Sequence, residues 1–289
     1  MINVPMFDGF EYTRESYEKY INDSLSMLDN IYDIHEIGNT VQGRKMYGFS
    51  LGDLKKPTIY IQGNIHGSHE WRTCYWVREF MNIIANPGNV PQSKKINEVK
   101  SMFSFYFIPS CNPDGFENGT YGNANGVSLS RNFDYLWNES PPREDEPYYK
   151  GPSPFSEPET QIIRDVLLDI KAVSLVCCHS WGGYTGFTIR GAHGTNVHDV
   201  LFENMYKSLY TSSKIPNGTD SKLSPKLNSP SVYNWMGHVE SSIGVRSIAQ
   251  VLETGTLETE YDQARLGLNG LYMHILYVYE RVRNGNIIL

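Results

Sequence analysis

Residues 57–71 read PTIYIQGNIHGSHEW. The part up to Asn64 is apolar on both faces, which is typical of a strand inside a sheet. From Glu70 onwards the apolar residues repeat at the spacing of one helix face, which predicts a helix. His66, His69 and Glu70 stand between the two elements, so two pairs of metal ligands are open: His66 with Glu70, or His66 with His69.

Strands and helices alternate along the rest of the chain, which predicts an α/β fold with a mixed, mainly parallel central sheet and helices on both faces. We expect one domain over residues 1–289. Ser156 and Glu159 are typical of a capping box at the start of a helix. Further strands are expected in 34–53, 102–110, 172–180, 185–190 and 247–255, helices in 12–30, 156–170, 197–211 and 261–283, and long loops in 109–155 and 212–232.

The composition excludes several classes of protein. A formal net charge of −7 argues against a nucleic-acid-binding protein, which is usually basic. No apolar run approaches the roughly 18–20 residues of a membrane span. The N-terminus, MINVPMFDGFEYTRES, lacks the basic start and apolar stretch of a secretory signal. We therefore expect a cytoplasmic protein, with export by another route and a trimmed signal as the alternatives; the sequence predicts no oligomeric state.

Four polar residues follow strands that are far apart in the sequence. His66, His179 and Glu253 each come at the end of a predicted strand, and Arg131 lies in the long loop after another. In parallel sheets, ligands bind beyond the carboxyl ends of the strands. These side chains are therefore expected at one edge of the sheet.

The residue types at this edge suit a catalytic zinc site. Such a site usually takes three His or carboxylate ligands and leaves one position for water. A further carboxylate that is not a ligand can take a proton from that water. His179 and two residues between 66 and 70 would supply the ligands for one zinc ion per chain, and Glu253 the base.

Six segments, in this order, resemble the zinc carboxypeptidase (M14) family almost from end to end. No single segment is specific, but the six together make a strong match. They are IGNTVQGRKMYGFSLG (37–52), IYIQGNIHG with the following EW (59–71), NPDGF with NANGVSLSRNFDYLW (112–137), PFSEPET (154–160), CHSW (178–181) and VLETG (251–255).

The resemblance implies a role for each matching residue. His66 and His179 would bind zinc together with a carboxylate. Glu253 would be the general base and would later pass the proton to the leaving amine. Arg131, with Ser130 beside it, would grip the terminal carboxylate of a peptide or amino-acid-derived substrate, a task that suits a planar bidentate donor. Tyr233 is the nearest candidate for a tyrosine that closes over the substrate, although its spacing to Glu253 does not align cleanly.

The ligand segment departs from the family pattern by one residue. The family has H-x-x-E, whereas here Glu70 follows His66 at one position more. With an insertion Glu70 keeps its role, and the following Trp71 starts the helix as in the family. We therefore favour His66, Glu70 and His179 as the zinc ligands. Without the insertion, His69 takes the place of the glutamate and the site has three histidines.

Two further departures lie in the substrate loop. Tyr121 or Gly122 stands where the family has an arginine that stabilises the oxyanion; loss of such a donor typically costs roughly 10²–10³ in rate. The candidates to replace it are Arg72, Arg190 and Arg246. The chain also has SLSRNF where the family usually has DLNRNF, so that Ser130 replaces an asparagine that helps to bind the substrate carboxylate.

The expected function is hydrolysis of a C-terminal peptide bond by a zinc-dependent peptidase. The first alternative is a zinc amidohydrolase on the same scaffold that acts on N-acyl amino acids or peptidoglycan stem peptides. The second alternative is a non-catalytic binder that keeps the fold. The remaining histidines that no motif supports are interpreted as structural: His193, His198, His238 and His274.

Overall fold

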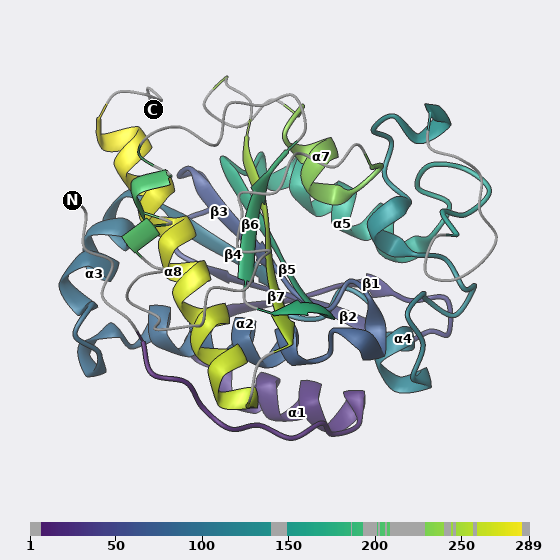
Figure 1. Cartoon of the computed structure of the whole chain (residues 1–289), viewed down its shortest axis with the longest axis horizontal. Helices are drawn as coiled ribbons and strands as arrows, with labels where there is room; N and C mark the ends of the chain where they lie inside the picture. Colours follow the sequence, from purple (N-terminus) through teal and green to yellow (C-terminus); the bar gives the residue numbers. More distant parts are fainter. Residues whose placement is uncertain are drawn as a thin grey trace.

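A mixed sheet of seven strands runs through the described part of the chain, in the order β1-β2-β4-β3-β5-β7-β6 (Figure 1). This computed structural model describes residues 7–139, 149–185, 187–192, 201, 203–205, 207–208, 229–239, 244, 247–256 and 259–284. The strands are β1 (Asp33–Asn39), β2 (Lys45–Leu51), β3 (Thr58–Gln62), β4 (Ser104–Ile108), β5 (Ser174–Thr185), β6 (Phe187–Gly191) and β7 (Ile248–Thr256).

The centre of the sheet is parallel and its two edges are antiparallel. β3 pairs in parallel with β4 on one side and with β5 on the other, and β5 pairs in parallel with β7. β1, β2 and β6 join in antiparallel pairs. All residues of β3 and β4 are buried, as strands covered on both faces must be. The predicted mixed α/β fold is confirmed, and β3, β5 and β7 run toward the same edge.

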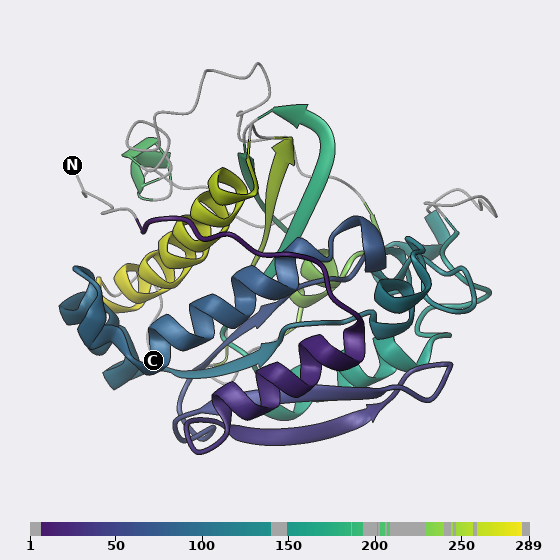
Figure 2. The ribbon, with the colours of Figure 1, turned by 90° about the horizontal axis from the view of Figure 1, so that it is seen from below.

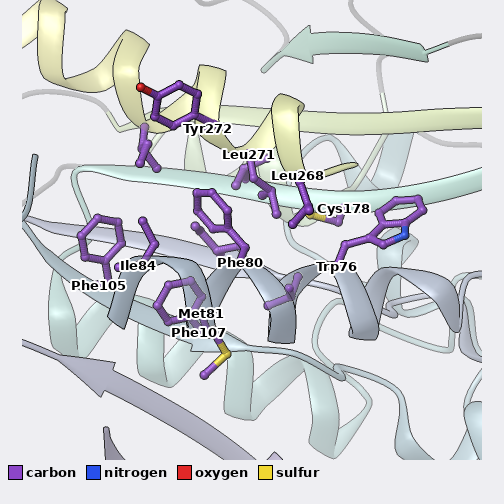
Figure 3. Close-up of a cluster of buried hydrophobic side chains, with 14 of the residues drawn as sticks. Trp76, Phe80, Met81, Ile84, Phe105, Phe107, Cys178, Leu268, Leu271 and Tyr272 are labelled. Carbon is purple, nitrogen blue, oxygen red and sulfur yellow. The ribbon is translucent and has the colours of Figure 1, made fainter. Parts of the chain in front are cut away.

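Four helices cover one face of the sheet: α1 (Tyr17–Leu28), α2 (Arg72–Ala85), α3 (Ser93–Met102) and α8 (Glu260–Arg283). α2 packs against α8, and Figure 2 shows α1 and α2 from below. Figure 3 shows the large side chains of α2, β4 and α8 meeting in one hydrophobic cluster, among them Trp76, Phe80, Phe107 and Leu271. This apolar layer fixes α2, whose start follows directly on the candidate ligand Glu70.

The helices α5 (Pro158–Ile170) and α7 (Val232–Met236) cover the opposite face, on the other side of the central strands from α8 (Figure 1). Side chains along a strand alternate between the faces. Leu175 and Cys177 of β5 accordingly belong to the cluster under α5, whereas Val176 and Cys178 belong to the cluster under α2 and α8. The same alternation turns His179 toward the α5 face.

The predicted loop 109–155 contains short helices where the structure describes it: α4 (Pro113–Asn118), η3 (Leu129–Arg131) and η4 (Trp137–Glu139). The remaining 3₁₀ turns are η1 (Gly67–His69) and η2 (Pro87–Asn89). The helix α3 was not expected. The predicted helix 197–211 and loop 212–232 fall largely outside the described residues. Among the described helices, none has both the length and the hydropathy that a membrane span requires.

The predicted Ser156 cap of α5 is wrong by one residue. Glu157 is the N-cap residue and makes no side-chain cap hydrogen bond. The Ser156 hydroxyl instead donates to Glu157 Oε1 at 2.7 Å and accepts from Asn132 Nδ2 at 2.9 Å. The predicted partner Glu159 accepts from Asn123 Nδ2 and from the Val41 backbone N–H. Other contacts, among them those with Asn132, Asn123 and Val41, therefore take up the groups that a local capping box would use.

Candidate metal and substrate site

The chain leaves β3 through a left-handed residue, Asn64, whose φ is +53°. Asparagine is among the few residues that adopt this conformation readily. Its backbone N–H donates to Thr73 Oγ1 at 2.6 Å, and its Nδ2 donates to Ser110 Oγ at 2.9 Å. The bend thus ties β3, α2 and the end of β4 together, and it directs the following His66 into the interior, where it is 6% exposed.

The extra residue between His66 and Glu70 is taken up by the η1 turn, Gly67–His69. Gly67 has φ +49°, and a Cβ on it would stand 2.3 Å from the carbonyl oxygen of Thr120. The backbone N–H of Ser68 donates to that same oxygen at 3.0 Å. The turn returns Glu70 to the interior, 3% exposed, and leaves His69 exposed. Of the two ligand sets weighed from the sequence, the structure brings together the one with Glu70.

His66, Glu70 and His179 meet in one buried cluster. Glu70 Oε1 is 2.9 Å from His66 Nδ1 and 3.1 Å from His179 Nδ1. One ligand atom of each residue lies within 4.8 Å of the others. Ligands on one zinc ion with bonds of about 2.0–2.2 Å stand about 3.4 Å apart in a tetrahedron. The spacing is therefore close to what one zinc ion requires, and no other such group occurs in the described residues.

Two atoms of this cluster test whether a cation fits. Within the part of the chain that the structure describes, the buried Glu70 Oε2 has no hydrogen-bond partner, and the buried His66 Nδ1 lies 2.9 Å from Glu70 Oε1 without completing a hydrogen bond. Leaving one buried polar atom unsatisfied costs about 1–3 kcal/mol. An imidazole nitrogen and a carboxylate oxygen with free lone pairs are the donors that zinc takes. The residues present therefore fit the ion.

Electrostatics in the cluster favour the metal-binding forms of His66 and Glu70, and the protonated form of His179. Burial lowers the pKa of His66 to about 4, more than the Glu70 carboxylate raises it. For Glu70, burial raises the pKa, but the imidazoles of His179 and His66 outweigh it and hold the pKa well below its usual range. Burial also lowers the pKa of His179, yet Glu70 and Cys177 together raise it well above its usual value. Glu70 is thus an ionised carboxylate, and its field favours positive charge at this point.

The outer nitrogens of both imidazoles have partners that orient the rings. His66 Nε2 lies 2.5 Å from Ser130 Oγ, and His179 Nε2 lies 3.2 Å from Cys177 Sγ. The Cys177 sulfur also accepts from Gln62 Nε2 at 3.2 Å. A hydrogen bond at Nε2 fixes the tautomer and leaves Nδ1 to face the metal. Both inner nitrogens, Nδ1, point at Glu70.

Glu253 stands next to His179 across the β5–β7 pair. The two residues are register partners in this parallel pair, so their side chains share the α5 face. Neither strand ends there, as the sequence reading had assumed, because β5 continues to Thr185 and β7 to Thr256. Glu253 is half-buried. The structure therefore places a carboxylate beside the His/Glu/His cluster but outside it.

Arg131 reaches the same region from the η3 turn. Its Nη1 donates to Ser128 Oγ at 3.0 Å, to Tyr121 Oη at 3.3 Å and to Ser130 Oγ at 3.3 Å. Since Ser130 also contacts His66, the guanidinium is joined to the cluster through one hydroxyl. The four segments expected at one edge of the sheet do converge there.

Tyr121, and not Gly122, occupies the position beside the cluster. Its ring stacks on that of His66, with the ring centroids 4.2 Å apart at 19°, and it meets the His69 ring edge-on at 5.4 Å. Burial raises the pKa of Tyr121 to about 12, although Arg131 acts against this, so the phenol is neutral. Gly122 is packed against the backbone of Gly126.

The proposed substitutes for the missing arginine receive no support where the structure describes them. Arg72 pairs with Glu260 at 3.1 Å and lies over the Trp71 ring, 4.8 Å from its centroid. The side chain of Arg190 and the whole of Arg246 lie outside the described residues. Tyr233 lies in α7, 5% exposed, within the hydrophobic cluster under α5. Its contact with substrate stays a prediction.

Two residues of the site were not predicted from the sequence. Ser128 binds Arg131, and Cys177 binds His179. Ser128 could have been found, because SLSRNF differs from DLNRNF at its first position as well as its third. Cys177 gave no signal beyond lying two residues before His179 on a strand, where it shares the same face.

Comparison with known proteins identifies relatives of this chain. A family model described as zinc carboxypeptidase matches residues 17–226. Carboxypeptidase B of Astacus astacus is 31% identical over 188 residues, which are 54% of this chain and 58% of that protein. Mast cell carboxypeptidase A of Rattus norvegicus is 29% identical over 213 residues, which are 61% of this chain and 50% of that protein.

The solved structures agree on the fold. The crystal structure of carboxypeptidase A from Helicoverpa armigera matches with a TM-score of 0.68 and 17% sequence identity, covering 94% of this chain and 75% of that one. At this low identity the likeness bears on the fold alone. The chain spans about half the length of the two curated relatives, 58% and 50%.

Proposed function

Because the chain belongs to the zinc carboxypeptidase family, we propose that it is a zinc-dependent peptidase that hydrolyses the C-terminal peptide bond of its substrate. The observation that carries the proposal is the buried convergence of His66, Glu70 and His179, with Glu70 Oε2 unpartnered among the described residues. These three residues would hold the metal. A zinc ion held there would polarise the scissile carbonyl and lower the pKa of a water molecule toward neutrality.

The chain's own residues divide the remaining work. Glu253, next to His179 on the same face of the sheet, would take the proton from the attacking water and pass it to the leaving amine. Arg131 would bind the terminal carboxylate of the substrate, because a guanidinium offers two parallel N–H donors. The hydroxyls of Ser128, Ser130 and Tyr121 hold its Nη1 in place.

One observation favours a second candidate, an amidohydrolase of N-acyl amino acids or peptidoglycan stem peptides on the same scaffold. The neutral phenol of Tyr121, stacked on His66, stands where the family has a cationic arginine. A neutral donor stabilises a developing oxyanion less than a charged one. The position that stabilises the oxyanion in the family's peptidases is therefore altered here, which leaves room for an amide substrate other than a plain peptide.

The first experiment replaces the proposed base. Glu253→Gln keeps the size of the side chain and removes its basicity, so kcat should fall by about 10²–10⁴ while zinc content stays at one ion per chain. Turnover of a blocked dipeptide and metal analysis of the same sample give both numbers. Glu260→Gln, an acid seven positions further on, serves as the matched control. A Glu253→Gln protein with unchanged kcat would rule out this base.

The second experiment separates the two candidate reactions. Wild-type protein is given a blocked dipeptide with a free carboxylate and, separately, the same compound as its C-terminal amide. A carboxypeptidase that relies on Arg131 should prefer the free carboxylate strongly. Equal rates would favour the amidohydrolase, and zinc binding without either reaction would favour a non-catalytic binder.

A further inference from the structure

A continuous line of hydrogen bonds joins the candidate metal ligand to the candidate carboxylate-binding arginine. Ser130 Oγ lies 2.5 Å from His66 Nε2 and 3.3 Å from Arg131 Nη1. Ser128 Oγ lies 3.4 Å from Ser130 Oγ and 3.0 Å from Arg131 Nη1. Both serines are buried, Ser130 at 7% and Ser128 at 1% exposed. One hydroxyl, that of Ser130, therefore touches both functional groups.

The direction of these hydrogen bonds follows from what each group can do. A His66 ring that offers Nδ1 to a cation must carry its proton on Nε2, so it donates to Ser130 Oγ. Arg131 can only donate. Ser130 Oγ thus accepts from both neighbours, which uses both of its lone pairs, and its own proton is left for Ser128 Oγ. The Ser130 side chain has one arrangement that satisfies all three contacts.

Tyr121 contacts both ends of this line of hydrogen bonds, His66 and Arg131. Its ring covers the face of His66, and its hydroxyl accepts from the same Arg131 Nη1 that contacts Ser130. His66 is thereby held by a ring on its face and a hydroxyl at its edge. Both of these groups also contact Arg131 Nη1.

We propose that Ser130 is a positioning residue that sets the orientation of His66 and Arg131 together, and so couples metal affinity to recognition of the substrate carboxylate. This inference rests on the proposed function. A metal-binding histidine whose outer N–H meets a carboxylate becomes a stronger ligand. Here the outer N–H meets a neutral hydroxyl that a guanidinium also polarises. His66 is therefore a weaker electron donor to the metal than a histidine bonded to a carboxylate. The neutral hydroxyl adds no negative charge beside Arg131, at the expense of metal affinity.

The test uses changes at Ser130 with two independent readouts. Zinc affinity is measured on metal-free protein by competition with a chromogenic chelator, without substrate, and KM is measured with the blocked dipeptide. Ser130→Ala should lower zinc affinity by about 10–100-fold, the usual effect of losing such a partner, and should also raise KM. Ser130→Thr keeps the hydroxyl and should restore both values to near those of the wild type.

Ser130→Asp gives the sharpest result, because its two effects have opposite signs. A carboxylate at this point should raise zinc affinity through His66 and, by neutralising Arg131, should raise KM. Ser128→Ala is the matched control: it removes a contact of Arg131 but none of His66, so KM should rise while zinc affinity stays within about threefold. A purely structural role would lower both functions in every variant. The thermal midpoint of each metal-free variant shows whether it folds. If Ser130→Ala does not fold, the zinc affinity and KM of Ser130→Asp decide the test.

The outcomes separate this inference from the proposed function. A Ser130→Ala protein with the zinc affinity of the wild type, or a Ser130→Asp protein with lower zinc affinity, overturns the coupling and leaves the proposed function intact. Wild-type protein that binds zinc without hydrolysing the dipeptide contradicts the proposed peptidase function. The zinc affinities of the Ser130 variants then still test whether Ser130 positions His66. Wild-type protein that binds no zinc overturns both.

Discussion

The strands β5 and β7 carry two buried histidine clusters, one on each face of the sheet. On the α5 face, His179 of β5 meets His66 and Glu70, with Glu253 of β7 beside it. On the α8 face, Ser174 of β5 and Gln250 of β7 bind His274 of α8. The first cluster lies toward the end of the parallel pairing and the second near its start.

The two clusters differ in how their polar atoms are satisfied. His274 has a partner for each ring nitrogen: Ser174 Oγ at 3.1 Å and Gln250 Oε1 at 2.6 Å. Burial lowers the pKa of His274 to about 3, so the ring is neutral. In the other cluster, both imidazoles turn Nδ1 toward the same carboxylate oxygen, Glu70 Oε1, and Glu70 Oε2 has no hydrogen-bond partner in the described residues. Both histidine clusters are buried. Only the cluster on the α5 face has lone pairs that converge on one point, so it is the one that fits a cation.

The largest expected effect is a response to zinc at the α5 face alone. Zinc that binds only folded protein should raise the free energy of unfolding by about 4 kcal/mol when its free concentration is 1,000 times Kd. In Glu70→Gln this gain should disappear, because the charged ligand at the centre of the cluster is lost. Urea unfolding with and without zinc measures it.

His274→Gln is the control for this experiment, since it alters the other cluster. It should gain as much from zinc as the wild type does. A Glu70→Gln protein that zinc still stabilises fully would place the metal elsewhere.

Removing the imidazole from the α8 face should have the next largest effect. His274→Ala loses a buried ring and leaves Ser174 and Gln250 each without a partner, so the free energy of unfolding should fall by about 3 kcal/mol. Zinc affinity and turnover per folded molecule should stay as in the wild type. Urea unfolding of metal-free protein and chelator competition provide the numbers. A fall in zinc affinity comparable to that of Glu70→Gln would mean that the two clusters act together.

The smallest of the three effects is a pH dependence of stability. His274 has a folded pKa of about 3, below its unfolded value of about 6.5, so the unfolded chain binds more protons. Stability from the neutral ring is present above pH 6.5 and is lost as the pH falls toward 3. Between pH 7.5 and pH 5 this group should cost about 2 kcal/mol.

Comparing wild type with His274→Gln isolates this contribution, because the remaining groups titrate alike in both proteins. Metal-free samples are unfolded with urea at the two pH values. If both proteins lose the same stability between them, the ring of His274 does not stay neutral in the fold.

The sequence predicted those parts of the site that follow strands with a clear apolar pattern. Strand patterns brought the segments of His66, His179 and Glu253 to one edge of the sheet, but they wrongly ended two strands at His179 and Glu253, since β5 and β7 continue past these residues. The expectation that residues 1–289 form one domain stays a prediction. The roles of Glu253, Arg131 and Tyr233 in catalysis and binding stay predictions too.

Contacts between distant segments were beyond the sequence. Ser130 and His66 are 64 residues apart, and Tyr121 reaches the same ring from a loop with no periodic pattern. The choice between Glu70 and His69 depended on whether one residue would bulge, and that is decided by the fit of Gly67 against Thr120. Ser156 was misread as a cap because its tertiary partner, Asn132, outweighs local preference.

The η1 turn has a consequence for exchanging parts between relatives. Ser68 N–H binds the carbonyl of Thr120, directly before Tyr121, and the turn can approach that carbonyl only because residue 67 is a glycine. The segments 64–70 and 112–131 are therefore one transplantable unit. A chimera that imports the arginine-bearing loop of a relative would also have to import that relative's shorter ligand turn, or the two would not fit together.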